Sequence, residues 1–101
     1  MVNDKFLGLL GIASGARKLC FGLERAAAAA ADGQAKLIIT AGDISRKSAK
    51  EAAFAADKAG IDCIGVDYTI DQLGHAVGSR AGVIAVTDDG IAQRLAALQN
   101  H

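Results

Sequence analysis

The segment Gly33–Asp43, GQAKLIITAGD, decides the fold because it places a helix end, a buried strand and a turn in immediate succession. Its glycine is the residue expected just past the C-terminus of a helix. Lys36–Thr40 is an apolar, β-branched run of the kind that forms a strand buried on both faces. Ala41–Asp43 is the turn that leads from this strand into the next helix. The segment therefore predicts an α/β protein, in which strands and helices alternate.

The same alternation continues along the chain in both directions. We expect strands at Lys18–Phe21, Lys36–Thr40, Ile61–Val66 and Val83–Val86. We expect helices from an Asn3–Asp4 cap to Gly15, at Leu23–Asp32, through Ala49–Ala56 to Gly60, from Thr69 to Val77, and from Thr87–Asp89 onward. The element order αβαβαβαβα predicts a three-layer α/β/α sandwich around a largely parallel sheet. Without a linker or an internal repeat, we expect one domain over residues 1–101.

Two local patterns predict how particular helices pack and begin. Gly8, Gly11 and Gly15 form a small-residue face on the first helix, which would let a neighbouring backbone approach closely. Thr69 and Gln72 have the spacing of a capping box at the start of the fourth helix.

The composition excludes several classes of protein. The chain has 101 residues, 51% of them hydrophobic, with equal numbers of basic and acidic side chains and no proline. These values argue against disorder, a collagen-like repeat and a strongly basic nucleic-acid module. The charge is uneven, since residues 1–60 hold nine Lys or Arg and six Asp or Glu, whereas residues 61–101 hold two and five. A polyanion site is therefore expected within residues 1–60.

Neither a metal site nor a catalytic site is predicted. Cys20 and Cys63 lie in apolar stretches without zinc-ligand spacing, so we expect free thiols in the core and no metal. Adjacent Asp88 and Asp89 are explained by the favourable position of acidic residues at a helix N-terminus. His75 has no acid–base partner, and no set of nucleophile, base and orienting group is visible. We therefore expect no cofactor and no enzymatic activity.

The sequence also predicts where the protein is located. No apolar run approaches the ~20 residues of a membrane span. Phe6–Ala13 is apolar, but the residues before it carry no net positive charge, and Arg17–Lys18 follow where a cleavage site would stand. We therefore expect a cytoplasmic protein with no membrane partner.

The strongest functional signal is the helix between Gly22 and Gly33. Its N-terminus follows a short strand, and the unpaired N–H groups and dipole of a helix N-terminus favour phosphate. Arg25 lies in its first turn. Further basic residues near it in the chain are Arg17, Lys18, Lys36, Arg46 and Lys47. These residues predict a polyanion site, although a solvated basic rim without a ligand would have the same pattern.

The order of elements and several phrases resemble the L-seven-Ae family of ribosomal and kink-turn RNA-binding proteins. The phrases are Leu10–Ala13, Ala16–Leu19, Gly22 with Gly33, Ala35–Ile39, Leu73–Gly78 and Val83–Asp88. The opening and closing phrases are most similar to the bacterial, non-ribosomal branch, whose members are typically encoded beside transcription-termination and translation-initiation factors. The resemblance covers roughly residues 5–98 and implies a mixed four-stranded sheet between helices.

The resemblance also implies where RNA binds. In the family, the site is formed by the N-terminus of the second helix and the loop after the fourth helix, which here are Gly22 onward and Val77–Gly82. Glu24 and Arg25 hold the positions that read sheared G·A pairs, and the loop shelters a base flipped out at the kink. Ala28 stands where kink-turn binders carry a lysine, which implies weaker phosphate binding and a flatter salt dependence.

We therefore predict a non-catalytic RNA-binding protein whose partner is structured RNA of ribosomal or kink-turn type, not DNA. The expected RNA-binding residues are Gly22, Glu24, Arg25, Lys36, Asp43, Lys47, Ser79, Arg80 and Ala81. The ribosome and factors of translation or transcription are further expected partners. Two alternatives stay open. One is a protein-interaction module that presents the smooth Ala26–Ala31 helix, and the other is a small-molecule enzyme, which would need an enclosed pocket with titratable groups.

Overall fold

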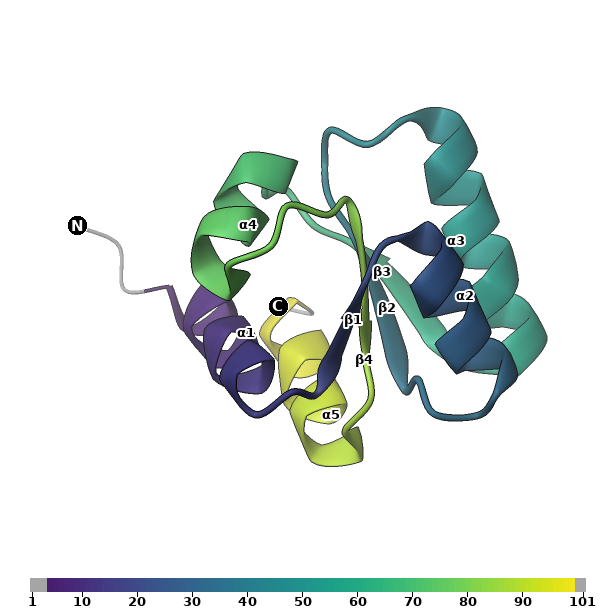
Figure 1. Cartoon of the computed structure of the whole chain (residues 1–101), viewed down its shortest axis with the longest axis horizontal. Coiled ribbons are helices and arrows are strands. Elements are labelled where there is room, and N and C mark those ends of the chain that lie inside the picture. The colour runs from purple at the N-terminus through teal and green to yellow at the C-terminus, as the bar shows by residue number, and fades with distance from the viewer. Residues whose placement is uncertain (1–3, 100–101) are drawn as a thin grey trace.

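The computed structural model describes residues 4–99, so the expected cap residue Asn3 lies outside the described residues. Within that range, helices and strands alternate in the predicted order (Figure 1). The helices are α1 (Lys5–Gly15), α2 (Leu23–Ala31), α3 (Arg46–Ala59), α4 (Ile70–Val77) and α5 (Asp89–Gln99). The strands are β1 (Leu19–Phe21), β2 (Leu37–Thr40), β3 (Asp62–Gly65) and β4 (Val83–Val86). Across residues 4–99, no helix has the length and apolar character needed to cross a membrane.

The four strands form one mixed sheet in the order β1-β4-β2-β3. β2 and β3 pair in parallel, whereas β4 pairs antiparallel with both β1 and β2. The largely parallel sheet expected from the alternation is therefore wrong, and the mixed sheet implied by the family resemblance is confirmed. The physical reason is the connection after β3. The short helix α4 and its following loop bring the chain back to the end of the sheet where β3 stops, so β4 starts beside Thr40 and runs in the opposite direction.

Helices cover both faces of the sheet, which confirms the three-layer α/β/α sandwich (Figure 1). One face packs against α1, α4 and α5 through large side chains such as Leu10, Leu73 and Ile84. The other face packs against α2 and α3, where most of the buried residues are alanines and Ile38 is the largest. Alanine at the contact allows α2 and α3 to lie close to the sheet with a thin layer of core between.

The ends of the helices follow the signals read from the sequence. The Asp4 side chain accepts a hydrogen bond from the Leu7 N–H at 2.9 Å, and so caps α1. Thr69 forms the predicted capping box with Gln72 at the start of α4. Asp88 accepts from the Ile91 N–H at 2.9 Å. The Asp88 carboxylate therefore caps the start of α5, in agreement with the favourable position of acidic residues at a helix N-terminus.

The expected glycine face of α1 is confirmed at one position of three. A Cβ added to Gly11 would lie 3.0 Å from the Ala76 carbonyl oxygen, so glycine lets α1 approach the backbone of α4. The Ser14 hydroxyl donates to the Val77 carbonyl at 2.8 Å and joins the same two helices. Gly8 and Gly15 have nothing within 4 Å of an added Cβ, and both are exposed. The expectation is wrong for these two because neither meets a neighbouring element.

The two cysteines are free thiols on the two outer strands of the sheet. The register places Cys20, Ala85, Ile38 and Cys63 in one row across the four strands, so two strands separate the two sulfur atoms and no disulfide can form. Both side chains are half-buried, which corrects the expectation that they lie fully in the core. An outer strand has a neighbour on one side only, and its side chains keep contact with solvent. Burial nevertheless raises the pKa of the Cys63 thiol.

Tyr68 joins the loop after β3 to the start of α1. Its ring stacks on Phe6 with centroids 5.6 Å apart, and its hydroxyl donates a hydrogen bond to the Asp4 carboxylate. Desolvation, followed by the hydrogen bond and the negative charge of Asp4, raises the pKa of Tyr68 to about 12.

We expect a native-state titration of tyrosinate absorbance to have its midpoint near pH 12, above the usual phenol pKa of 10.0. Tyr68 is the single tyrosine and the chain has no tryptophan, so the signal has one source. Because the pKa is raised in the folded state, the stabilising contribution is complete below pH 10 and is lost as pH rises through 12. Asp4→Asn should lower the midpoint, and the urea-unfolded chain provides the reference near 10. A native midpoint near 10 would contradict this account.

Candidate nucleic-acid interface

The two parts of the predicted RNA site lie side by side at one end of the sheet. The Gly22 N–H donates to the Val83 carbonyl at 2.8 Å, and the Ala41 N–H donates to the Gly82 carbonyl at 2.8 Å. These bonds hold the start of α2 and the end of β2 against the last residues of the α4–β4 loop (Figure 1). The antiparallel direction of β4 is the cause, because it places the start of this strand beside the end of β1.

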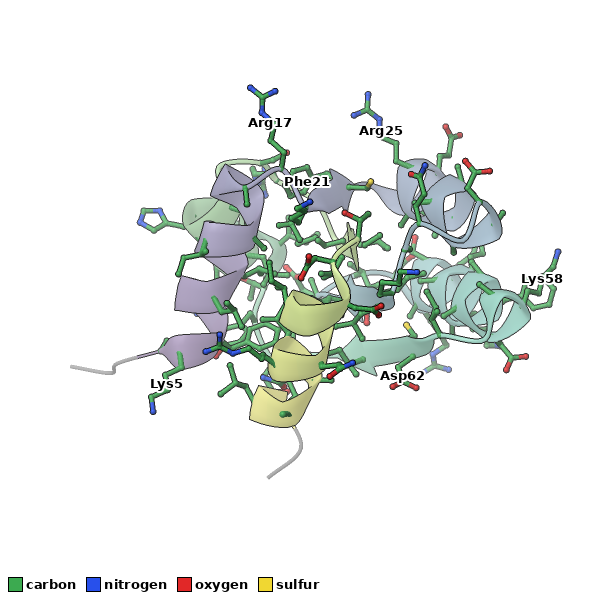
Figure 2. All side chains as sticks on the ribbon, turned by 90° about the horizontal axis from the view of Figure 1, so that it is seen from below. Lys5, Arg17, Phe21, Arg25, Lys58 and Asp62 are labelled. Carbon is green, nitrogen blue, oxygen red and sulfur yellow. The ribbon has the colours of Figure 1, made fainter. Side chains whose placement is uncertain are left out.

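The start of α2 presents backbone donors and a basic side chain together. Gly22 has φ +98°, which favours glycine, and no side chain among residues 4–99 accepts a hydrogen bond from the first turn. Glu24 and Arg25 are exposed, and the Arg25 guanidinium projects into solvent (Figure 2). Ala26 is fully buried and anchors the turn on the sheet. Ala28, one turn further on, is exposed, so the position where kink-turn binders carry a lysine faces solvent.

The α4–β4 loop is held by its flanks and by one exposed ion pair. Gly78 ends α4 with φ +80°. The Arg80 guanidinium lies 2.6 Å from the Asp71 carboxylate, and both side chains are more than 70% exposed, at 73% and 78%. A pair this exposed contributes about 0–1 kcal/mol to stability, so a phosphate can compete with Asp71 for the guanidinium. Ser79 is half-buried and Ala81 is buried, so Arg80 is the exposed side chain among these three residues of the loop.

Asp43 and Ile44 support this loop from the β2–α3 connection. The Asp43 carboxylate accepts from the Ile70 N–H at 2.8 Å, so it helps to cap α4. Ile44 covers Gly82 so closely that a Cβ added there would lie 2.2 Å from the Ile44 Cγ2. Asp43 is therefore placed at the site as a supporting residue. Ile44 is not among the predicted site residues. Its contact with Gly82 joins residues nearly forty positions apart, and no spacing pattern in the sequence indicates such a contact.

The remaining basic residues divide between the two ends of the sheet. Arg46 and Lys47 begin α3, beyond the end of β2 that Ala41 marks, and both are exposed. Lys36 precedes β2, so the length of the strand separates it from Gly22. Its ammonium donates to the Gly33 carbonyl at 3.2 Å, at the C-terminal end of α2. Eight of the nine predicted residues therefore lie beyond one end of the sheet, whereas Lys36 lies at the opposite end.

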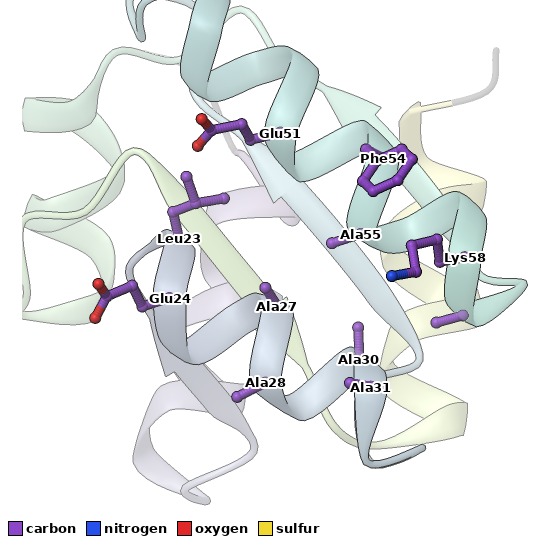
Figure 3. A pocket seen from close by; sticks show the side chains of 11 residues that line it. Leu23, Glu24, Ala27, Ala28, Ala30, Ala31, Glu51, Phe54, Ala55 and Lys58 are labelled. Carbon is purple, nitrogen blue, oxygen red and sulfur yellow. The ribbon is translucent and has the colours of Figure 1, made fainter.

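A groove of about 690 Å³ runs between α2 and α3, next to this end of the sheet (Figure 3). Its floor is formed by small side chains such as Ala27 and Ala55, with Glu24 and Glu51 towards one end. Phe54 is 64% exposed on its rim, and the Lys58 ammonium lies 5.3 Å from the centre of its ring. The groove is open to solvent.

The fold and this end of the sheet define the class of protein. It is an α/β/α domain in which the N-terminus of α2 is exposed beside the α4–β4 loop, and this loop leads into the antiparallel strand β4. The sequence matches the Ribosomal protein L7Ae/L30e/S12e/Gadd45 family over residues 4–96, and the chain belongs to this family. The resemblance read from the sequence is confirmed.

Two solved structures are similar to this chain. A protein with unknown function from Bacillus halodurans C is 34% identical, with a TM-score of 0.92 over 96% of this chain and 98% of that one. The Giardia lamblia 15.5kD RNA binding protein is 18% identical, with a TM-score of 0.74 over 97% of this chain and 88% of that one. At that identity the second likeness concerns the fold alone. None of the curated protein sequences compared with the chain matches it.

Proposed function

We propose that this protein binds structured RNA of ribosomal or kink-turn type, without catalysing a reaction, as an accessory factor of translation. Membership in a family of ribosomal proteins supports this proposal. The observation that carries it is the contact between Gly22 and Val83, which puts an uncapped helix N-terminus beside the α4–β4 loop. Donors for phosphate and the loop that would shelter a base are thus presented to one ligand.

Each part of the site has a role that follows from its chemistry. Phosphate oxygens accept hydrogen bonds from the first N–H groups of α2 and from Arg25. The Glu24 carboxylate accepts from an exposed base amino group. Ser79 and Ala81 shelter an unstacked base. The Arg80 guanidinium leaves its ion pair with Asp71 and binds a phosphate instead. In addition, Lys47 of α3 adds charge at the same end of the sheet.

Ala28 determines how this site differs from that of a lysine-bearing kink-turn binder. Its methyl group faces solvent and contributes no charge. One fewer phosphate contact flattens the plot of log affinity against log salt by about one unit. Moderate affinity with weak salt dependence is therefore the expected behaviour of the wild-type protein.

The experiment is a binding titration against a kink-turn RNA and against the same RNA with its G·A pairs broken, at several salt concentrations. We expect micromolar or tighter binding to the first RNA and loss of binding to the second, because recognition depends on the shape that the G·A pairs create. Equal weak binding to both, or none, would overturn the proposal. It would favour instead the protein-interaction alternative, for which the groove beside Phe54 offers the surface.

A further inference from the structure

β1 is an outer strand whose free edge is lined by backbone polar groups. The Lys18 carbonyl accepts from the Thr87 N–H, and the Gly22 N–H donates to the Val83 carbonyl. In an antiparallel ladder the residues that bond to the partner alternate, so Lys18, Cys20 and Gly22 face β4. The N–H and C=O groups of Leu19 and Phe21 therefore point away from the sheet. No strand of the sheet pairs with them, because β1 is an outer strand.

An arginine stands at each end of this edge. Arg17 precedes β1 and Arg25 follows it, and their guanidinium groups project from the same side of the molecule (Figure 2). Both are exposed, and neither lies within 4.0 Å of a carboxylate among residues 4–99, where Arg80 with Asp71 is the ion pair found. The two cations are thus available to a ligand that lies along the strand.

The backbone at Arg17 shows which substitution can remove its side chain without straining the turn. Its φ of +60° is the single positive value of a non-glycine residue between 4 and 99. A glycine adopts this conformation without the steric cost that a Cβ brings. The turn itself is formed by backbone hydrogen bonds from Ala16 to Ile12 and from Arg17 to Ser14, which do not use the arginine side chain. The turn therefore does not depend on the arginine side chain.

We propose that the β1 edge from Arg17 to Arg25 is a binding track for the sugar-phosphate backbone of the RNA strand whose other contacts lie at the α2 terminus. This inference rests on the proposed function. The outward N–H groups and the two guanidinium groups donate to phosphates, and the outward C=O groups of Leu19 and Phe21 accept from 2′-hydroxyls. From Arg17 to Gly22 the track spans about 16 Å at 3.3 Å per residue. An RNA strand bound along this track would run from the N-terminus of α2 towards the α1–β1 turn, away from α3.

Arg17→Gly tests the track because it keeps the backbone conformation and removes only the side chain. We expect the melting temperature to stay close to that of wild type, the affinity for kink-turn RNA to fall roughly tenfold at about 50 mM salt, and the salt slope to flatten by about one unit. Arg17→Lys should retain the salt slope. Arg94→Ala, which removes an arginine from the middle of α5, is the matched control and should bind like wild type.

The outcomes separate this inference from the proposed function. If wild-type protein binds the intact RNA selectively and Arg17→Gly binds it with the same affinity and salt slope, the track is overturned and the proposed site stands. If wild-type protein does not distinguish the intact RNA from the one with broken pairs, both fail. Replacing single 2′-hydroxyls by hydrogen along the RNA strand provides a second readout, since positions that lie on the β1 edge should lose affinity in the wild-type protein.

Discussion

Arg25→Glu should weaken the binding of structured RNA by about a hundredfold and flatten the salt slope by at least about one unit. The substitution replaces a donor at an uncapped helix N-terminus by a charge that repels phosphate at the same place. The fold should not change, because the side chain is exposed and makes no ion pair within residues 4–99. The measurement is the titration against the intact kink-turn RNA at several salt concentrations.

Two controls separate the effect of the position of Arg25 from the effect of the change in net charge. Arg94→Glu changes the net charge by the same amount on α5, which packs against the opposite face of the sheet from α2, so it should reduce affinity only by the general loss of charge. Arg25→Lys keeps the positive charge and should retain most of the binding. Unchanged affinity in Arg25→Glu would show that RNA does not use the start of α2.

Ile38→Ala should lower the free energy of unfolding by about 3–4 kcal/mol, out of the roughly 5–15 kcal/mol that a small domain has. Ile38 is fully buried in the centre of β2 and is the largest buried side chain between the sheet and helices α2 and α3. Its neighbours on these helices, such as Ala26 and Ala52, are too short to fill the space that it would leave. The cavity therefore remains, and its cost adds to the lost burial of the side chain.

Urea denaturation measures this effect, with an unchanged m-value as evidence that the unfolded state is the same. Ile12→Ala removes the same atoms from a side chain that is 66% exposed on α1 and should change stability by less than about 0.5 kcal/mol. A loss below about 1 kcal/mol in Ile38→Ala would mean that α2 and α3 collapse onto the sheet. In that case the start of α2 would move, and RNA binding should decline with it.

Much of the local structure could be predicted because neighbours in the chain decide it. The capping box of Thr69 and Gln72 and the cap by Asp4 each join residues three positions apart. The positive φ of Gly33 follows from the place of this residue just past the end of α2. The core could be predicted in the same way, since the run at β2 is apolar up to Thr40 and all four of its residues are buried.

The candidate site could be predicted only in part, because it depends on contacts between distant segments. Glu24 and Arg25 were identified from their place in the first turn of α2, and they lie where the prediction put them. Lys36 was included because it is close to them in the chain, yet β2 begins at the far end of the sheet and carries it away. Asp43 was identified, but its bond to the Ile70 N–H, which makes it a support of the loop, joins residues that are far apart in sequence.

By itself, the sequence determined the number, order and capping of the elements, the buried strands and the polar, glycine-led start of α2. These depend on propensity, periodicity and hydrogen bonds within a few residues. Only the tertiary structure decided the direction of β4. Strand direction depends on where α4 packs against α1, a contact that Gly11 permits, and on pairing between residues more than forty positions apart. That direction brings Val83 to Gly22 and leaves the β1 edge free between two arginines.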